Sequence, residues 1–477
     1  MTALWTSKAI AAAMGARRQG ELPAEITGIS IDSRTLGKSD AFFAIKGDAR
    51  DGHDFVEAAL KAGAGVAVVS AKQRARFSRK APLLIVPDVL GALRKLARAA
   101  RKRSEAKVIA VTGSVGKTST KEALRLALSA DGETHASVAS YNNHWGVPLT
   151  LARFPESARY GVFEIGMNHA GEITPLVKMV RPHIAIVTTV APVHLEYFGS
   201  VAKIADAKAE IFSGVVRGGF AVLNRDNDQF ARLSRAAKAA GVTNIVTFGE
   251  HPKADARLVK FALHPDCSTV QADILGSEVT YKLGAPGRHL LLNSLAVLTA
   301  ARLAGADLAL AALALARLEP AAGRGVQKRL AMPGGAALLI DESYNANPAS
   351  MRAAIALLGQ LRPEGGGRRI AVLGDMLELG KKAGELHAEL AKPLVEAGID
   401  LVFCSGPAMH SLWQALPSTL KGGYAETAAA LEPAVLRTVR AGDAVMVKGS
   451  LGSKMAPIVK ALEQQFPRLP AEPAAHS

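Results

Sequence analysis

The stretch VIAVTGSVGKTST, residues 108–120, decides the fold predicted for this chain. It begins as a short apolar strand, passes through a turn with two glycines and runs into a helical pattern, KEALRLAL. Backbone N–H groups in such a turn, the positive end of the helix and a lysine side chain all attract phosphate oxygens. The stretch therefore predicts a phosphate-binding loop whose ligand is a nucleoside triphosphate.

The spacing within this loop differs from that of the common P-loop. Two residues, instead of four, separate Gly113 from the Gly116–Lys117 pair. A chance Gly-Lys-Thr sequence is the alternative, but the motif has the strand before it and the helix after it that phosphate binding requires. We expect Lys117 to neutralise the β- and γ-phosphates of ATP and Thr118 to bind Mg²⁺ through its hydroxyl. The predicted ATP-binding residues of the loop are Gly113, Ser114, Val115, Gly116, Lys117, Thr118 and Ser119.

Length and composition are those of an ordinary globular protein. The 477 residues suffice for two to four domains, and 49% of them are apolar and 21% charged. The N-terminal residues predict a short Ala-rich helix and not a secretion signal. The longest apolar helical run, residues 308–316, is far shorter than the roughly 20 residues that cross a membrane. We therefore expect a cytoplasmic protein without a membrane span.

The net charge of +16 favours an acidic partner, which could be nucleic acid, anionic lipid or a polyanionic small substrate. Many of the basic residues lie between positions 72 and 103. This cluster lacks the regular interleaving of aromatic residues that stacks on nucleic-acid bases, so we interpret it as solvated helix faces.

Alternating strands and helices predict an α/β protein of three domains. Residues 1–86 are expected to form a small α/β domain, followed by a basic amphipathic helix at 89–103. Residues 87–318 predict a doubly wound, mostly parallel sheet with an antiparallel flap at about 256–283. A smaller Rossmann-like domain is expected at 319–466, and residues 467–477 predict a disordered tail.

Three charged residues outside the loop are candidates for chemistry. Glu164 interrupts the apolar strand GVFEIGMN, and a buried carboxylate needs a partner, so we favour a Mg²⁺ ligand over a structural ion pair. His194 follows another apolar strand and could be a structural residue or a ligand. Lys208, in KIADAKAEIF, has the pattern of a surface lysine.

Two polar segments have a higher density of functional side chains than structure alone requires. Residues 141–150, YNNHWGVPLT, predict a rigid turn that offers the amides of Asn142 and Asn143. Residues 341–348, DESYNANP, follow a predicted strand of the third domain, where Tyr344 and two asparagines could contact a base or a ribose.

In this order, the motifs resemble those of the Mur ligase family of ATP-dependent, amide-bond-forming enzymes. The resemblance covers nearly the whole chain, and the short phosphate loop is the family's own form. Its main segments are IDSRTL, AIKGDARDGHDF, TGSVGKTSTKE, YNNHWGVPLTL, EIGMNHAGEI, VHLEYFGS, AKAEIF, LNRDN, GRHLLLNSLA, DESYNANPASM, LGDMLELG and VKGS.

The resemblance implies a three-domain ligase in which ATP phosphorylates a carboxylate and an amino group then attacks the acyl phosphate. The family member that the chain resembles most adds D-alanyl-D-alanine to UDP-N-acetylmuramoyl-tripeptide in bacterial peptidoglycan synthesis. The implied partners are these two small molecules and no nucleic acid, and the implied cofactors are ATP and Mg²⁺. We expect a monomer.

The resemblance also implies residue roles. Catalytic residues would be Lys117, Glu164, His194 and Lys208, and the metal ligands Thr118, Glu164, His194 and a carbamate formed on Lys208. Further ATP contacts would be Asn293, Arg324, Asp341, Tyr344 and Asn345. The substrates would be bound by Ser33, Arg34, Lys46, Gly47, Asp51, Gly52, His53, Asn142, Asn143 and Lys448. Many relatives have a basic residue where this chain has Leu451, with Lys454 three residues on, so the dipeptide contact stays open.

Other functions remain as alternatives. A sister ligase that adds the third residue of the peptide shares much of the first two domains, but its DNPR stretch is absent here. Folylpolyglutamate synthase lacks a first domain of this kind. A nucleotide-dependent switch would not explain Glu164, Lys208 and the third-domain segment together. The basic cluster also permits a nucleic-acid-dependent NTPase, which stimulation of turnover by DNA or RNA would favour. The sequence does not disclose the third residue of the tripeptide.

Overall fold

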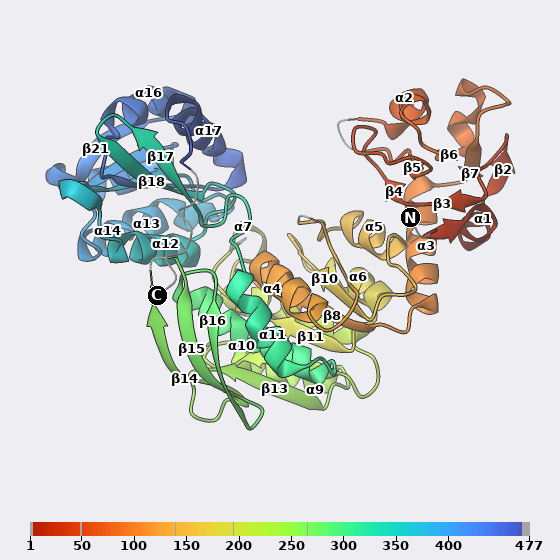
Figure 1. Ribbon diagram of the computed structural model, residues 1–477, viewed down its shortest axis with the longest axis horizontal. Coiled ribbons are helices and arrows are strands. Elements are labelled where there is room, and N and C mark those ends of the chain that lie inside the picture. Colours follow the sequence, from red (N-terminus) through yellow and green to blue (C-terminus); the bar gives the residue numbers. More distant parts are fainter. Residues whose placement is uncertain (1–2, 48–49, 139, 194, 265, 470–477) are drawn as a thin grey trace.

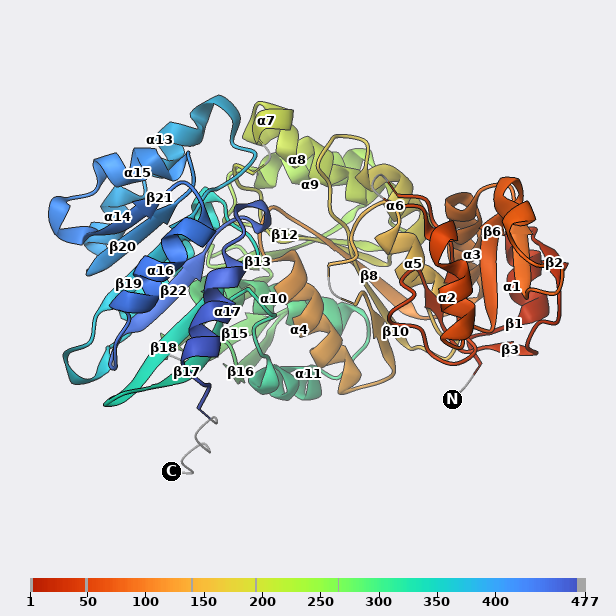
Figure 2. The same ribbon diagram turned by 90° about the horizontal axis from the view of Figure 1, so that it is seen from above.

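The computed structural model describes residues 3–469 apart from 48–49, 139, 194 and 265. Its described part contains three large β-sheets, and the longest sheet lies between the other two (Figure 1, Figure 2). The α/β class and the three-part architecture expected from the sequence are confirmed. The domain boundaries stay a prediction, and each large sheet lies within one of the predicted ranges.

The first sheet has five short strands, four of them parallel. In spatial order they are β2 (Arg17–Gln19), β7 (Leu83–Val86), β6 (Val66–Ser70), β5 (Ala41–Phe43) and β4 (Ile29–Ser30). The antiparallel strand β2 forms one edge. The helices of this part are α1 (Ser7–Met14) and α2 (Val56–Lys61), and β1 (Trp5–Thr6) pairs with β3 (Glu25–Ile26).

The central sheet has nine strands. In spatial order they are β16 (Ser277–Leu283), β15 (Ser268–Ile274), β14 (Ala256–Leu263), β13 (Asn244–Gly249), β12 (Phe220–Asn224), β11 (Ile184–Val187), β8 (Lys107–Thr112), β10 (Tyr160–Glu164) and β9 (Thr134–Ala136). The strands from β13 to β9 are parallel. The antiparallel segment expected at 256–283 forms β14, β15 and β16, which continue the same sheet.

The strand order reverses its direction at β8. From β8 the chain crosses to β9 and β10 on one side and then to β11, β12 and β13 on the other. In open α/β sheets, ligands bind at such a reversal, beyond the carboxyl ends of the strands. The loop of residues 113–116 that follows β8 therefore occupies the position where a ligand is expected.

Helices cover both faces of the central sheet. They are α3 (Val89–Arg103), α4 (Lys117–Ser129), α5 (Gly146–Ala152), α6 (Ile173–Val180), α8 (Val201–Ala209), α9 (Phe230–Ala239), α10 (Arg288–Leu303) and α11 (Leu308–Ala314). Because side chains alternate along a strand, Val108 and Ala110 pack with α3, α5 and α6, while Ile109 and Val111 pack with α4, α10 and α11.

The apolar core of the first sheet continues into one face of the central sheet. Phe43 and Leu84 of the first sheet belong to the same buried cluster as Val108 and Ala110 of β8. Helix α3, whose bounds match the sequence prediction, contributes Leu96 to this cluster. Its N-cap is Asp88, whose carboxylate accepts hydrogen bonds from two backbone N–H groups of the first turn.

The third sheet has six strands, all parallel except its edge strand β17. Their order is β17 (Val326–Met332), β18 (Gly335–Glu342), β22 (Ala444–Lys448), β19 (Arg369–Gly374), β20 (Leu401–Ser405) and β21 (Lys421–Ala425). Its helices are α12 (Pro348–Gln360), α13 (Ala383–Ala388), α14 (Ala391–Glu396), α15 (Met409–Ala415), α16 (Ala428–Thr438) and α17 (Ala456–Gln465).

The end of the described chain lies against β17. Leu469 N–H donates to Arg329 O, and Ala331 N–H donates to Pro467 O, both at 2.8 Å. Residues 467–469, which the sequence assigned to a disordered tail, are therefore paired with a strand. The remainder of that predicted tail, 470–477, lies outside the described residues. Within the described ranges, no helix combines the length and the apolar character needed to span a bilayer.

His183 fixes the start of the central strand β8 and makes stability depend on pH. Val108 N–H donates to His183 Nδ1 at 2.9 Å. Burial, helped by the charges of Arg101, Lys107 and Arg181, lowers the pKa of His183 from 6.5 to about 4. Between these two pH values the His183 side chain is protonated in the unfolded chain and neutral in the folded chain. The free energy of unfolding therefore decreases as pH falls from about 6.5 to about 4.

We expect His183→Asn to remove this part of the pH dependence. Urea unfolding from pH 7.5 to 4.5 should show the midpoint of the variant rising relative to that of the wild type as pH falls. His410→Asn, at an exposed position of the third part, is the control and should leave the slope unchanged. Identical slopes for wild type and His183→Asn would contradict the assignment.

Candidate active site

The loop after β8 is held in an open turn. Gly116 has φ 87°, a left-handed conformation that suits glycine, and α4 begins at the next residue. A Cβ atom at position 116 would collide with the side-chain amide of Asn293 on α10. The Lys117 ammonium donates to Gly113 O at 2.8 Å, so it lies along the loop. Glycine at position 116 therefore leaves room for the Asn293 side chain against the loop.

Residues that follow β11 support the loop from the neighbouring strand. The Thr188 hydroxyl donates to Val115 O at 2.6 Å. Ser114 N–H donates to Thr189 O at 2.8 Å, and the Ser114 hydroxyl donates to Ala191 O at 3.1 Å. These contacts orient the loop at the carboxyl ends of two adjacent parallel strands.

Glu164 is the last residue of β10 and is 1% exposed. The Thr118 hydroxyl donates to its Oε2 at 3.0 Å, and the Asn142 side-chain amide donates to its Oε1 at 2.7 Å. Ser140 Oγ lies 3.4 Å from Thr118 Oγ1. The buried carboxylate predicted from the sequence is thus paired with hydroxyl and amide donors and not with a cation. It sits directly beside the first turn of α4.

Positive charge gathers around the loop. Burial lowers the pKa of Lys117, the nearby Glu164 carboxylate opposes this, and the charge of Arg324 lowers the pKa further. Arg324 lies on the segment that leads into β17, so a cation of the third part approaches the loop of the central sheet. The three side chains predicted at separate positions are therefore neighbours.

Lys208 is not the surface lysine that its sequence pattern suggests. It lies near the C-terminus of α8 and is 2% exposed. Burial and, secondly, the charge of Lys117 lower its pKa well below the ordinary value for lysine. A buried lysine with a lowered pKa is a reactive amine because a larger fraction of it is neutral. His194, the fourth predicted catalytic residue, lies outside the described residues.

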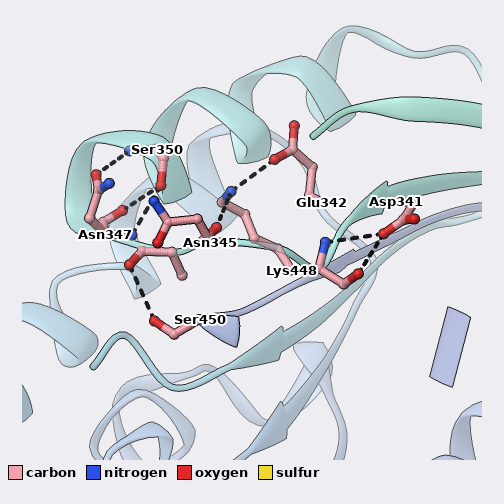
Figure 3. A network of polar contacts seen from close by, with 9 residues as sticks. Asp341, Glu342, Asn345, Asn347, Ser350, Lys448 and Ser450 are labelled. Atoms are coloured by element: carbon pink, nitrogen blue, oxygen red, sulfur yellow. Dashed lines mark hydrogen bonds and ion pairs between the residues drawn. The ribbon is translucent and has the colours of Figure 1, made fainter. Parts of the chain in front are cut away.

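The third sheet contributes a buried lysine at the end of β22. The Lys448 ammonium, 2% exposed, pairs with Glu342 Oε2 at 2.9 Å and donates to Asn345 O at 3.1 Å (Figure 3). The Ser450 hydroxyl donates to Ala346 O at 3.4 Å. Lys448 and Ser450 thereby hold the segment 342–347 in place, and the Lys448 ammonium is already engaged within its own sheet.

The remaining predicted residues of the third part surround this segment. The Arg324 guanidinium stacks over the Tyr344 ring at 4.5 Å, and Tyr344 N–H donates to Gly323 O. Asp341 Oδ1 accepts hydrogen bonds from the backbone N–H and the hydroxyl of Ser343 at 3.2 and 2.6 Å. Asn345 contributes its carbonyl to Lys448. Arg324, Asp341, Tyr344 and Asn345 therefore belong to one neighbourhood.

A cavity of about 230 Å³ joins the two parts. Ser114 and Lys117 of the loop form one wall. The opposite wall comes from the third part and consists of Asn345, Ala346, Asn347, Leu377, Glu378, Leu379, Ser450, Leu451 and Gly452. The phosphate loop and the segment held by Lys448 thus face each other across one space.

The candidate residues of the first part collect at one edge of its sheet. Ser33 and Arg34 follow β4, and the residues from Lys46 to His53 follow β5, the adjacent parallel strand. Arg34 is exposed and forms a two-point contact with Asp32 at 2.7 and 2.9 Å. This edge lies beside α5, whose C-cap Arg153 donates to Ile29 O of β4 (Figure 1).

The DGH run of the first part has structural contacts of its own. His53 Nδ1 lies 2.6 Å from Asp51 Oδ1, and Ser70 N–H donates to His53 Nε2 at 2.9 Å. A Cβ at Gly52 would lie 2.6 Å from Ile45 O. Lys46 and Gly47 are exposed. Of these residues, Arg34, Lys46 and Gly47 are therefore the ones free to contact a ligand, and their predicted roles stay predictions.

Sequence reasoning missed several residues of this neighbourhood. Thr188 supports the loop at Val115, Ser140 contacts the Thr118 hydroxyl, and Glu342 engages Lys448. A signal existed for Thr188, since two threonines end the apolar strand IVTTV. Glu342 adjoins the predicted Asp341, but nothing in the sequence says that it faces β22.

The fold and this neighbourhood define a nucleotide-using enzyme whose phosphate loop faces a separate α/β part across a cavity. Family models match three successive stretches: the catalytic domain of the Mur ligase family at 25–101, the Mur ligase middle domain at 111–301 and the Mur ligase glutamate ligase domain at 328–451. The chain belongs to the Mur ligase family, and it is an ATP-dependent ligase that forms amide bonds.

Individual relatives match this chain over nearly its whole length. The UDP-N-acetylmuramoyl-tripeptide–D-alanyl-D-alanine ligase of Escherichia coli is 35% identical, with 93% of this chain and 96% of the relative covered. A MurF crystal structure from Acinetobacter baumannii has a TM-score of 0.82 at 30% identity, covering 96% and 99%. A MurF ligase from Thermotoga maritima in complex with ADP has a TM-score of 0.75 at 26% identity, covering 92% and 97%.

Replacing Gly116 tests the loop. We expect Gly116→Ala to weaken ATP binding at least about tenfold, because the new Cβ meets Asn293 where the loop has a left-handed conformation. Gly241→Ala is a matched control, with φ 85° and open space around it, so it carries similar backbone strain without the collision. Isothermal titration calorimetry with ATP would measure both. Equal affinities for the two variants would contradict the model of the loop.

Proposed function

We propose that this protein joins D-alanyl-D-alanine to UDP-N-acetylmuramoyl-tripeptide with consumption of ATP, in the synthesis of peptidoglycan precursors. The observation that carries the proposal is the juxtaposition of the loop lysine, Lys117, with the segment 345–347 of the third part across one cavity. The name of the E. coli relative, matched over nearly its full length, supports the choice of substrates.

The loop supplies what the first chemical step needs. A carboxylate that attacks the γ-phosphate of ATP brings two anions together, so positive charge fixed around the transferring group stabilises the transition state. Lys117 supplies such a charge at the loop, and Arg324 adds a second one from the third part. This step releases ADP and forms an acyl phosphate, which exclusion of water would protect from hydrolysis. The dipeptide amine then attacks its carbonyl carbon, the C–N bond forms, and inorganic phosphate leaves as the amine loses a proton.

The donor set beside the loop fits Mg²⁺. The Thr118 hydroxyl and the Glu164 carboxylate are oxygen donors 3.0 Å apart, and Mg²⁺ prefers oxygen ligands. Among the described residues, no three His, Cys, Asp or Glu side chains gather as a metal cluster. Phosphate oxygens of the nucleotide are further ligands of the kind that Mg²⁺ prefers. A bound Mg²⁺ would neutralise charge on the phosphates. Thr118 and Glu164 would hold it, and Asn142 would orient the carboxylate.

Lys208 is proposed to carry a carbamate. Its lowered pKa leaves the neutral amine that attacks CO₂, forming an N–C bond and releasing one proton. The change replaces a buried neutral amine by an anion, which the positive charge of Lys117 attracts. The carbamate would supply a further oxygen ligand to a metal ion, together with His194.

The incoming dipeptide is assigned to the cavity between the two parts. Leu377 and Leu451 present exposed apolar side chains at its rim, and Leu451 is 63% exposed. These side chains suit the methyl groups of D-alanyl-D-alanine. Lys448 is proposed to position the cavity wall without contacting the dipeptide, through its hydrogen bond to the carbonyl of Asn345. Asp341, Tyr344 and Asn345 are assigned to the adenosine of ATP.

The uridine end of the other substrate is assigned to residues that follow β4 and β5. Ser33, Arg34, Lys46 and Gly47 would contact it, with Asp51, Gly52 and His53 shaping the turn behind them. Asn142 and Asn143 would contact the peptide. The cytoplasmic location and the monomeric state expected from the sequence stay predictions.

Phosphate release tests the proposed reaction directly. We expect fast release from ATP and Mg²⁺ only when UDP-N-acetylmuramoyl-tripeptide and D-alanyl-D-alanine are both present, with a product heavier by one dipeptide residue in the mass spectrum. Release that responds to a single amino acid in place of the dipeptide would identify the sister ligase. Release that ignores both substrates would contradict the ligase reaction.

Replacing the buried lysine tests the carbamate. We expect Lys208→Ala to lose most of the turnover, with partial recovery when a small carboxylate such as formate or acetate is added, because the added anion can occupy the vacated space. Lys203→Ala, at an exposed position of the same helix, should keep the wild-type rate. Near-normal turnover of Lys208→Ala would show that no carbamate is needed.

A further inference from the structure

A second and larger cavity, of about 760 Å³, lies on the other side of the candidate active site. Helix α3 forms one wall, and α6 with the segments after β9 and β10 forms the other. The polar and charged residues of its lining are Arg94, Arg98, Asn142, Asn143, His144, Asn168, His169 and Glu172.

The cavity connects with the reaction centre through Asn142. This residue lines the cavity and also donates to Glu164 Oε1 at 2.7 Å. Gly166, two residues after Glu164, lines the cavity as well. A substrate whose reacting carboxylate lies beside the loop and Glu164 must therefore extend into this space with the groups next to that carboxylate.

Two arginines on α3 point their charge at this space. Arg94 and Arg98 are four residues apart, which places them one turn apart on the same helix face. Leu93 and Leu96 on the opposite face are buried in the core, so the helix cannot rotate the arginines away. Among the described residues, neither guanidinium has an ion pair or a hydrogen-bond partner.

The single carboxylate of the lining is already engaged. Glu172 Oε2 accepts a hydrogen bond from Asn168 N–H at 2.7 Å, and Glu172 Oε1 lies 3.3 Å from His169 Nδ1. Both contacts of the Glu172 carboxylate lie within the turn of residues 168–172 and not with α3. The two guanidinium groups therefore remain available for a carboxylate that arrives with a substrate.

We propose that this cavity holds the peptide of the acceptor substrate and that Arg94 and Arg98 select its last residue. They would favour a residue whose side chain carries a second carboxylate, as in diaminopimelate, over one whose side chain ends in an amine alone, as in lysine. The inference rests on the proposed function, because it assumes that the last residue of the tripeptide supplies the reacting carboxylate.

The physical basis is the pairing of guanidinium with carboxylate. A guanidinium donates two parallel hydrogen bonds to a carboxylate, and such charge-assisted bonds are stronger than neutral ones. Diaminopimelate and lysine differ by one carboxylate, so the pair of acceptors isolates this contact. A lysine side chain would place an ammonium near two cations with no gain in return.

The test compares two acceptors in the complete reaction. Initial rates would be measured with D-alanyl-D-alanine, ATP, Mg²⁺ and UDP-N-acetylmuramoyl-tripeptides that end in meso-diaminopimelate or in L-lysine. For wild type we expect kcat/KM at least about tenfold higher with the diaminopimelate acceptor, as one charge-assisted contact can supply. The Arg94→Gln/Arg98→Gln double variant should bring this ratio close to one, through a higher KM and a similar kcat.

Lys95→Gln is the matched control, since Lys95 is exposed on the same helix and outside the cavity lining. It should keep the wild-type ratio, and thermal unfolding should show that all variants are folded. Wild type that uses both acceptors equally, or a double variant that keeps the preference, would overturn the role of the arginines while the ligase reaction stands. Wild type that uses neither acceptor would instead overturn the proposed function.

Discussion

The carboxylate of Glu164 is the interaction on which the rest of the candidate site depends. It is buried at the end of β10, and the Thr118 hydroxyl and the Asn142 amide satisfy its two oxygens. A buried carboxylate without such donors would be costly. The same two contacts fix the first turn of α4 and the segment before α5 relative to the sheet. One acidic side chain thus sets the geometry in which the phosphate loop and both cavities meet.

The sequence predicted the fold well where apolar strands are interior and failed at the two edges of the third sheet. The buried strands β8 and β10 coincide with the apolar runs that precede the phosphate loop and that contain Glu164, because runs of apolar residues end at clear turns. The edge strands β17, VQKRLAM, and β21, KGGYA, were not predicted. An edge strand has one partner and one open side, so polar residues and glycines are tolerated and the pattern disappears.

The residues of the candidate site also fall into those that the sequence predicted and those that only the fold reveals. Lys117 and Thr118 belong to one local motif and were predicted together, whereas Thr188, Ser140 and Glu342 reach the site only because distant segments fold against one another. Lys208 has the sequence pattern of a surface residue, and only its burial reveals an unusual amine. The basic residues of α3 were interpreted from the sequence as a solvated helix face. In the structure two of them, Arg94 and Arg98, line a cavity.

The buried clusters connect the first part to the central part but not the central part to the third. The first and central parts share one continuous apolar core, while both described cores of the third part, one on each face of its sheet, contain residues of that part alone. Parts that share a core move as one body, and parts that meet across a polar cavity can rotate at little cost. The joint falls at residues 320–325, where Gly323 and Gly325 have φ of 70° and 98°. A rotation of the third part against the other two would therefore leave each of these apolar cores intact.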